Sequence, residues 1–533
     1  MQRRWNGWGD PSVEMEIPEQ GAAYLKEVLG EGRSQVDYPR WEFLKRIPKS
    51  RLPEHPLITT DPETRLSHSH GQSLPDWIGL RAGMLYRFPD GVAFPSSAEE
   101  VQSLLDFAEK QKIILIPYGG GTSVLGHLTV PEDRRPVLTV SLKRLNRMIN
   151  LDERSLLATF EAGIIGPDLE AHLQSHGFTL GHYPQSFEYS SLGGWIATRS
   201  SGQYSTLYGR IDEQFQGGTV VAPGGKLVIP PFPASAAGPD LRHLILGSEG
   251  RLGFITEATM KIQPLARGEE EAVFGLFFPS WERGVAGMRK LFARRIPLLM
   301  ARLSGARETS INLDFSGHER TVAFLRRYLP LRGVPNEEGC MCLLGFRGTD
   351  RLMKTLRKEV GTVLKEEKAV PLGKAMGESW KKYRFLMPYL RNTLWSMGYA
   401  VETVETAVIW SRVTETVEAM ERAMANSLAS FGEPVLTFSH LSSPYPTGSN
   451  IYTTALFKIA SDGEETLERW RHLKKAVSEA IVASGGTISH QHGVGLDHKP
   501  WIEAEKGEKG TNIMAAACSV LDPDGRMNPG KLL

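Results

Sequence analysis

Three consecutive glycines, Gly119 to Gly121, follow an apolar run and precede two hydroxyl residues in the stretch IPYGGGTSVLGH. Glycine lacks a Cβ, so its backbone can take positive φ and a ligand can approach the main-chain N–H groups closely. Consecutive N–H groups in a turn bind anions, and the hydroxyls of Thr122 and Ser123 add donors. The pattern predicts a phosphate or pyrophosphate site, with a purely structural turn as the alternative.

Known phosphate-binding motifs do not match this turn. No Gly-Lys-Ser/Thr follows, as a P-loop requires, and the Gly-x-Gly-x-x-Gly spacing of the Rossmann fingerprint is absent. Two further segments, GSEGRLGFITEA (residues 247–258) and PQSFEYSSLGGWIATRSSG (184–202), also combine glycines with small residues. Three such segments between residues 117 and 258 indicate a large cofactor with a pyrophosphate and a planar ring.

The stretch SHQHGVGLDH contains His490, His492 and His498. In a strand, residues i and i+2 share a face, so His490 and His492 would converge on one ligand. Asp497 is the only carboxylate within this stretch and no cysteine is close, which argues against a metal site. Catalytic or anion-binding histidines are favoured, and structural histidines are the alternative. By spacing alone, Arg302, Arg391 and Tyr452 are not distinguished from ordinary residues.

The sequence predicts secondary-structure elements around the first glycine turn that could position these groups. A strand at 91–94 is followed by an amphipathic helix that begins at Ser96 or Ser97, and a second strand at 113–116 leads into the turn. This is a β-α-β unit. Strands then dominate residues 137–265, with a hairpin at VVAPGGKLV, and residues 268 to about 480 alternate charged helices with strands.

Bulk properties exclude several classes of protein. A chain of 533 residues needs two or three domains, and a net charge of +1 gives no general attraction to nucleic acid. Three cysteines, two of them in a lone C-x-C, indicate neither a disulfide framework nor a zinc site. We find no signal peptide and no apolar run of membrane-spanning length. We therefore expect a cytoplasmic protein, with peripheral membrane contact left open.

Taken together, PYGGGTSV, YSSLGGWIATRSSG, GSEGRLGFITEATMKI, SHQHGVG and DPDGRMNPGKLL resemble the FAD-binding family of the vanillyl-alcohol oxidase type. WNGWG, PYLRN and ETVETAVIW are similar to its alkylglycerone-phosphate synthase branch. The resemblance implies an α+β fold with a two-subdomain FAD-binding domain of the PCMH type (79–267) and an α+β cap domain (268–480). An N-terminal arm (1–78) precedes them, and a C-terminal segment (481–533) would return to the flavin.

The resemblance also implies FAD held without a covalent bond, because covalently flavinylated relatives carry a histidine within the first glycine turn and this chain does not. The expected FAD contacts come from the three glycine-rich segments: Pro117, Tyr118, Gly119, Gly120, Gly121, Thr122, Ser123, Gln185, Ser186, Phe187, Glu188, Tyr189, Ser190, Ser191, Thr198, Arg199, Ser200, Ser201, Glu249, Gly250, Arg251, Leu252, Gly253, Phe254 and Ile255.

Members of this branch exchange the acyl chain of acyl-dihydroxyacetone phosphate for a long-chain fatty alcohol through an adduct at flavin N5, in ether lipid synthesis. The resemblance assigns Tyr452 to proton transfer, Arg391 to the substrate phosphate, and His490 and His492 to the flavin and phosphate. Arg302 and His440 are weaker candidates for the same pocket. A phenol has a pKa near 10, so proton removal by Tyr452 needs help from flavin or cations. A homodimer is expected by analogy.

Two positions depart from the family pattern. Gln491 replaces the middle of three successive histidines and cannot titrate, and Ala234 stands where a cation is usual. These departures favour the alternative function, an FAD-dependent oxidase or dehydrogenase of a 2-hydroxy acid or glycerol-phosphate-like substrate. A non-catalytic flavoprotein or lipid-carrier subunit is a third alternative. The apolar stretch WSMGYAVETVETAVIW (395–410) fits either the wall of a lipid tunnel or an ordinary core.

Overall fold

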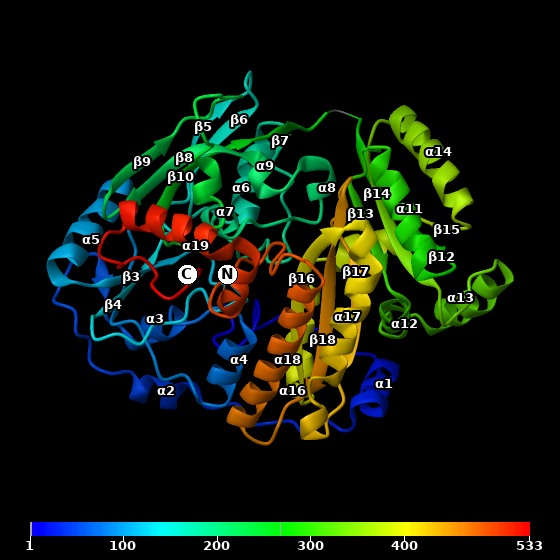
Figure 1. Cartoon of the computed structure of the whole chain (residues 1–533), viewed down its shortest axis with the longest axis horizontal. Coiled ribbons are helices and arrows are strands. Elements are labelled where there is room, and N and C mark those ends of the chain that lie inside the picture. The colour runs from blue at the N-terminus through cyan, green and yellow to red at the C-terminus, as the bar shows by residue number, and fades with distance from the viewer. Residues whose placement is uncertain (1–2, 267) are drawn as a thin grey trace.

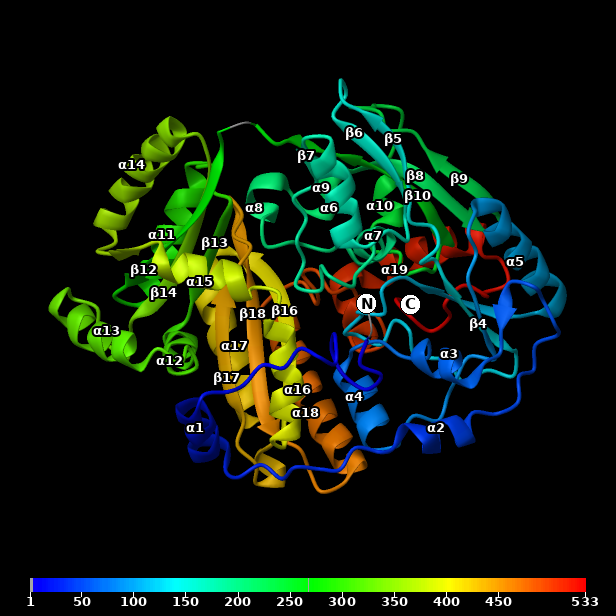
Figure 2. The same cartoon turned by 180° about the vertical axis from the view of Figure 1, so that it is seen from behind.

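The structure is a computed structural model that describes residues 3–266 and 268–533. Two lobes lie side by side in both views (Figures 1 and 2). One contains the three glycine-rich segments and is called the glycine lobe. The other, called the cap, is built on a seven-stranded sheet. This arrangement confirms the α+β expectation. The expected boundary at residue 267 falls outside the described residues. Among the described residues, no helix has the length and apolar character needed to cross a bilayer.

The β-α-β unit predicted from the sequence forms the first part of the glycine lobe. The helix begins at Ser97, whose side chain accepts a hydrogen bond from the Glu100 N–H, and it buries Val101, Leu104 and Leu105. The two flanking strands are parallel but not adjacent, because a third strand inserts between them in the order β1-β2-β4-β3. These elements are β1 (Ile58–Thr59), β2 (Gly91–Ala93), α5 (Ala98–Gln111), β3 (Ile114–Tyr118) and β4 (Val137–Ser141).

A five-stranded antiparallel sheet, in the order β5-β6-β10-β8-β9, forms the second part of the glycine lobe. The predicted hairpin is confirmed, since Ala222 pairs with Gly225 across a two-residue turn. The elements of this part are β5 (Met148–Asp152), β6 (Leu157–Glu161), α6 (Gly166–Ser175), β7 (Phe178–Thr179), α7 (Leu192–Thr198), α8 (Ser205–Tyr208), α9 (Ile211–Gln214), β8 (Phe215–Ala222), β9 (Gly225–Ile229), α10 (Arg242–Ile245), β10 (Phe254–Lys261) and β11 (Gln263–Pro264).

The cap sheet is antiparallel, with the order β15-β12-β14-β13-β17-β18-β16. Its strands are β12 (Glu270–Phe278), β13 (Met300–Ser304), β14 (Cys340–Gly348), β15 (Val370–Gly373), β16 (Tyr399–Ile409), β17 (Leu436–Leu441) and β18 (Gly448–Lys458). Glu405 pairs with Tyr452, and Tyr452 with His440. Direct cross-strand partners share a face, so these three side chains project from the same side of the sheet.

The longer helices cover the cap sheet with apolar stripes. In α14, for example, Met353, Leu356, Val360 and Val363 are buried. The cap helices are α11 (Trp281–Ala293), α12 (Ala306–Asp314), α13 (Glu319–Leu331), α14 (Asp350–Glu366), α15 (Ala375–Tyr383), η1 (Met387–Tyr389), α16 (Leu390–Ser396), η2 (Trp410–Arg412), α17 (Val413–Asn426), η3 (Ala429–Phe431) and α18 (Gly463–Ala483).

Both ends of the chain connect the lobes. The N-terminal arm carries α1 (Glu19–Leu29), α2 (Arg40–Arg46), α3 (Pro62–Ser67) and α4 (Leu74–Arg81), and α1 packs on the cap while α2 and α3 lie along the glycine lobe (Figures 1 and 2). After the cap, η4 (Lys499–Trp501) and α19 (Ile502–Leu521) lead back to the glycine lobe. There the Leu115 N–H donates to the Arg526 carbonyl at 2.9 Å. The C-terminal segment therefore returns to the lobe that carries the glycine turns.

Candidate active site

The first glycine turn follows β3 and packs directly against the segment 184–191. A Cβ on Gly120 would lie 2.1 Å from the Tyr189 carbonyl oxygen, and one on Gly119 would lie 2.3 Å from Ser191 Oγ. Gly121 has a φ of +67°, which L side chains rarely adopt. These glycines are therefore required because the chain packs closely against itself here, whether or not a ligand also approaches.

The turn nevertheless presents donors to an anion. Within the described part of the chain, none of the main-chain N–H groups from Gly119 to Ser123 donates a hydrogen bond to another protein group. The guanidinium of Arg3 lies beside them, bonded to the carbonyls of Gly120 and Tyr189 and 4.7 Å from the centre of the Tyr189 ring. Unpaired N–H groups next to a cation fit a pyrophosphate. Nothing in the sequence pattern distinguished Arg3.

The third glycine-rich segment joins the other two. The Glu249 N–H donates to the Ala197 carbonyl at 3.0 Å, and a Cβ on Gly250 would lie 2.8 Å from Pro117 Cγ. The Glu249 carboxylate accepts from the N–H groups of Val494 and Gly495. Segments of the glycine lobe thus meet the loop that carries His490 and His492 (called the histidine loop) at the buried Glu249 carboxylate. Phe254 is fully buried among apolar residues, so only its main chain is available to a ligand.

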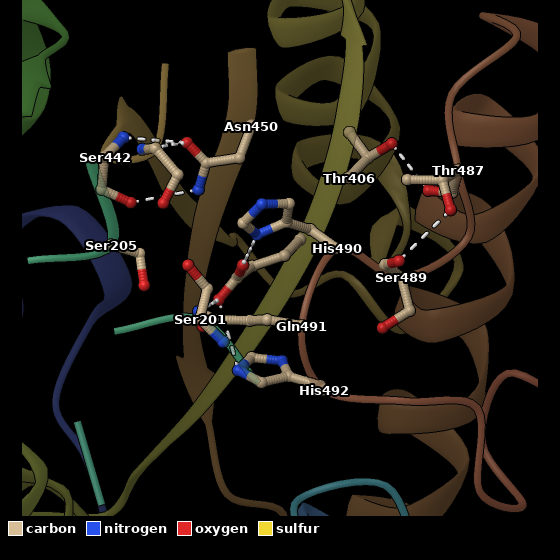
Figure 3. A network of polar contacts seen from close by, with 12 residues as sticks. Ser201, Ser205, Thr406, Ser442, Asn450, Thr487, Ser489, His490, Gln491 and His492 are labelled. Atoms are coloured by element: carbon tan, nitrogen blue, oxygen red, sulfur yellow. Dashed lines mark hydrogen bonds and ion pairs between the residues drawn. The ribbon is translucent and has the colours of Figure 1, made fainter. Parts of the chain in front are cut away.

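The histidine segment is a loop, which corrects the strand geometry expected for it. His490 and His492 still converge, because both reach the same buried carboxylate. Nδ1 of His490 lies 3.0 Å from Glu405 Oε2, and Nε2 of His492 lies 3.2 Å from Glu405 Oε1. Figure 3 shows both rings turned from the loop toward the cap sheet. His498, in contrast, is buried and makes no contact with Glu405 within the described residues.

Gln491 links the two lobes between these histidines. Its side-chain N–H donates to Glu405 Oε1 at 2.6 Å, and its oxygen accepts from the Ser201 N–H at 3.2 Å (Figure 3). Ser201 belongs to the segment expected to contact the cofactor, and its hydroxyl is buried without a partner among the described residues. A buried polar atom without a partner is costly, so this hydroxyl fits a polar ligand group.

A second buried carboxylate lies behind Tyr452. The ring of His440 stacks on that of Tyr452, with centroids 4.7 Å apart and planes 17° apart. Nδ1 of His440 lies 3.0 Å from Glu308 Oε1, which also binds Arg302 Nη2 at 2.7 Å. Arg302, His440 and Glu308 therefore form one cluster of contacts, and the stacked His440 ring connects this cluster to the Tyr452 ring.

Burial and charge set the protonation of this site. Burial alone would raise the pKa of Glu405, but His492, His490 and Gln491 outweigh it and hold that pKa at about 2. Glu308 is likewise held at a pKa of about 2, because His440 and Arg302 outweigh burial. Burial, followed by the charge of Glu405, raises the pKa of Tyr452 far above its ordinary value. At neutral pH both carboxylates are ionised and the Tyr452 hydroxyl keeps its proton.

Arg391 lies in α16, beside the cap sheet. Its guanidinium stacks over the Trp77 ring at 4.2 Å and donates to the Gln72 carbonyl at 2.6 Å. Burial lowers its pKa to about 10, so it remains charged at neutral pH. Its Nε is buried without a partner in the described part of the chain. A buried cation with an unused donor is suited to an anionic ligand group.

The sequence reading did not select Glu405, Glu308 or Tyr445. Tyr445 shares a short hydrogen bond of 2.6 Å with His490 Nε2. A signal for Glu405 was present, because it is a carboxylate among apolar residues of an alternating strand, and such a residue needs a buried partner. The partners lie in another part of the chain, so the pattern could not identify them. Ala234 lies in an exposed loop after β9, and nothing in the structure explains its departure from the family pattern.

Two family models match the chain. A model described as FAD binding domain covers residues 89–229, and a model described as FAD linked oxidases, C-terminal domain, covers residues 267–532. The first covers the glycine lobe as far as β9 and ends before its third glycine-rich segment, and the second covers the cap with the C-terminal segment.

Two similar proteins and a solved structure that each cover nearly the whole chain carry the same name. An alkyldihydroxyacetonephosphate synthase of Dictyostelium discoideum is 30% identical over 100% of this chain and 93% of its own length. The synthase of Trypanosoma brucei brucei is 29% identical over 99% of this chain and 92% of its own. A solved structure of an alkyldihydroxyacetonephosphate synthase superposes with a TM-score of 0.84 at 27% identity, covering 100% of this chain and 99% of that one.

Proposed function

Since this chain belongs to the alkyldihydroxyacetonephosphate synthase family of FAD-linked proteins, we propose that it exchanges the acyl chain of acyl-dihydroxyacetone phosphate for a fatty alcohol. The observation that carries the proposal is the position of Tyr452. It lies between two buried carboxylate–histidine clusters on the face of the cap sheet. Such an arrangement is suited to moving protons at a carbon next to a phosphate-bearing group.

FAD is the cofactor that the family implies, and the residues present fit it. The unpaired N–H groups of Gly119 to Ser123, with Arg3, would hold the pyrophosphate, and Ser201 would contact the ring. Bound FAD would supply the ring that accepts and returns the electron pair of the carbon at which the chains are exchanged. We propose a non-covalent complex, because no histidine lies within the glycine turn. The nearest along the chain, His127, is already paired with Glu249 at 3.1 Å.

The substrate would be held by the cations of the cap. Arg391, with its unused Nε–H, would bind the phosphate, and Arg302 would reinforce the charge of the pocket. Tyr452, which is protonated at neutral pH, would donate its hydroxyl proton to the departing acyl oxygen rather than accept one. A separate group must then accept the proton from carbon. His490 is buried, whereas 21% of the His492 side chain is exposed and can be reached by substrate.

Gln491 is compatible with this function. Its position requires a group that donates to Glu405 and accepts from Ser201 at once, and a neutral glutamine amide does both. We therefore expect Gln491→His to keep ether-forming activity within about threefold. Gln491→Glu should lower it by about 10-fold or more, because a second carboxylate would lie against Glu405. Rates of ether formation for both variants check this, and equal activity of the two would contradict it.

The experiment that tests the function uses FAD-loaded protein with palmitoyl-dihydroxyacetone phosphate and labelled hexadecanol. Labelled ether product, formed only when both substrates are present, supports the synthase. Anaerobic reduction of the flavin by lactate, glycolate or glycerol 3-phosphate is measured in parallel. Flavin reduction without ether product would instead establish the oxidoreductase alternative. Bound FAD with neither activity would establish a non-catalytic flavoprotein.

The remaining proposals concern organisation. We propose that residues 79–267 bind FAD, that residues 268–480 hold the substrate, and that residues 1–78 and 481–533 close the site between them. Ala400, Val404 and Val408 are buried in the cap core, as the core alternative for the stretch 395–410 expects. Homodimerisation, peripheral membrane contact and a cytoplasmic location stay proposals, to be tested by light scattering, vesicle sedimentation and fractionation.

A further inference from the structure

Glu405 contacts three consecutive residues of the histidine loop, with hydrogen bonds to His490 and Gln491 and an ion-pair contact to His492. Its Oε2 contacts His490 Nδ1 at 3.0 Å, and its Oε1 contacts His492 Nε2 at 3.2 Å and Gln491 Nε2 at 2.6 Å. The side chain of Glu405 is almost fully buried. An ionised carboxylate can only accept, so the bonded nitrogens of His490 and Gln491 carry the hydrogen. Hydrogen on Nε2 of His492 is favoured too, because a lone pair there would face the carboxylate oxygen at 3.2 Å.

This requirement fixes opposite tautomers in the two histidines. His490 carries its proton on Nδ1, and its Nε2 is then free to accept from the Tyr445 hydroxyl at 2.6 Å. Burial lowers the pKa of His490, so the ring is neutral at neutral pH. His492 carries its proton on Nε2, which leaves Nδ1 with a lone pair. The second nitrogen of a histidine is set by the bond that the first one makes.

The site needs a proton acceptor other than Tyr452. The rings of Tyr452 and His492 are adjacent, with centroids 6.3 Å apart in an edge-to-face arrangement. Glu405 and Tyr452 are direct cross-strand partners. Tyr452, a proton donor, and His492, with a free lone pair, therefore lie beside each other, and both are neighbours of the Glu405 carboxylate.

We propose that Glu405 is a positioning residue that sets the tautomers of His490 and His492, and thereby presents Nδ1 of His492 as the proton acceptor of the exchange reaction. The inference rests on the proposed function. In this step the C–H bond at the exchanging carbon breaks, its electron pair stays with the carbon, and an N–H bond forms at Nδ1. The resulting imidazolium is stabilised by Glu405 until the proton is returned to the carbon. The hydroxyl proton of the incoming alcohol replaces the one that Tyr452 gives to the departing acyl oxygen, so no net proton or electron is consumed.

Charged and titratable groups surround Glu405 on every side. His490 and His492 come from the loop, Tyr452 from β18 and His440 from β17, and Arg210 and Tyr445 lie behind His490. Arg210 donates to the Tyr445 hydroxyl at 3.3 Å and to the His490 carbonyl at 2.9 Å. The charge of Arg210 and the hydrogen bonds from His490 and Gln491 favour ionised Glu405, so its carboxylate form persists over the working range of pH.

The test combines kinetics with nitrogen NMR of histidine-labelled protein. In Glu405→Gln we expect kcat to fall by about 10²- to 10⁴-fold with a smaller change in KM. We also expect the acid limb of the pH–rate profile to move to lower pH, because the imidazolium loses its carboxylate partner. In wild-type protein at alkaline pH, NMR should show the Nε2–H tautomer at His492 and the Nδ1–H tautomer at His490. Signals are assigned with His490→Gln and His492→Gln.

Glu402→Gln is the matched control. Glu402 lies in the same strand on the opposite face, where it is buried against Lys474 at 3.4 Å and Trp470 Nε1 at 2.8 Å. Its loss should lower thermal stability but leave the acid limb in place. Glu405→Asp, which keeps a carboxylate, should retain the wild-type acid limb at reduced kcat.

Several results would overturn the proposal. These are an Nδ1–H tautomer at His492 in wild-type protein, an unchanged pH profile in Glu405→Gln, or the same shift in Glu402→Gln. The NMR measurement does not require an active enzyme, so a failure of the proposed function can be distinguished from a failure of this proposal. The expected tautomers in a protein that forms no ether product would uphold the positioning and overturn its assignment to this reaction.

Discussion

Replacing Tyr452 by phenylalanine should lower ether formation by about 10²- to 10⁴-fold while FAD stays bound. The variant keeps the ring that stacks on His440, with centroids 4.7 Å apart, and removes only the hydroxyl. Because burial and Glu405 keep this hydroxyl protonated, its loss removes the proton donor for the departing acyl chain. Steady-state formation of labelled ether and the absorbance spectrum of bound flavin measure the two halves of this prediction.

Tyr399→Phe is the matched control, because Tyr399 is also a buried tyrosine of the cap sheet. Its hydroxyl donates to the Gly30 carbonyl at 2.8 Å and accepts from the Gly32 N–H at 3.2 Å, so it holds the N-terminal arm. The control should lose about 1 kcal/mol of stability and keep its activity. Ether formation by Tyr452→Phe within tenfold of wild type would remove Tyr452 from the chemistry.

Gly120→Ala should prevent the protein from retaining FAD. A Cβ at this position would lie 2.1 Å from the Tyr189 carbonyl oxygen and 2.8 Å from Ser190 Cα. Both are main-chain atoms, so no side-chain rotation relieves the clash. The turn or the segment 184–191 must move instead, and the N–H groups that face the pyrophosphate would move with it. We expect FAD affinity to fall by about 100-fold or more, which corresponds to about 2.7 kcal/mol.

Flavin fluorescence titration of the FAD-free protein measures this affinity, and circular dichroism checks that the variant folds. Gly361→Ala is the control, because this glycine lies in α14 with open space where the Cβ would stand. That substitution should leave FAD affinity unchanged and add up to about 1 kcal/mol of stability, since alanine is the better helix former. FAD affinity of Gly120→Ala within threefold of wild type would show that the turn does not cradle the cofactor.

Local features of the sequence predicted a substantial part of this structure. The cap of α5 at Ser97, the hairpin of β8 and β9 and the glycine turn after β3 were all readable from residue type and spacing. These features depend on neighbours along the chain, such as a side chain that caps its own helix or a glycine that permits positive φ. His490, His492, Tyr452 and Arg391 were selected through a resemblance, which identifies residues without giving their contacts.

The contacts that define the site were decided only by the tertiary structure. His490 and His492 lie in a loop, so the alternation of a strand that was invoked for them could not bring them together, and Glu405 does so instead. Glu405 meets Tyr452 through the register of β16 against β18, and His440 meets it through β17. Register and loop placement follow from how whole elements pack, because burial of each apolar face fixes which residues lie opposite one another. The sequence by itself determined the kinds of groups in the site, whereas packing between distant segments determined which carboxylate each histidine meets.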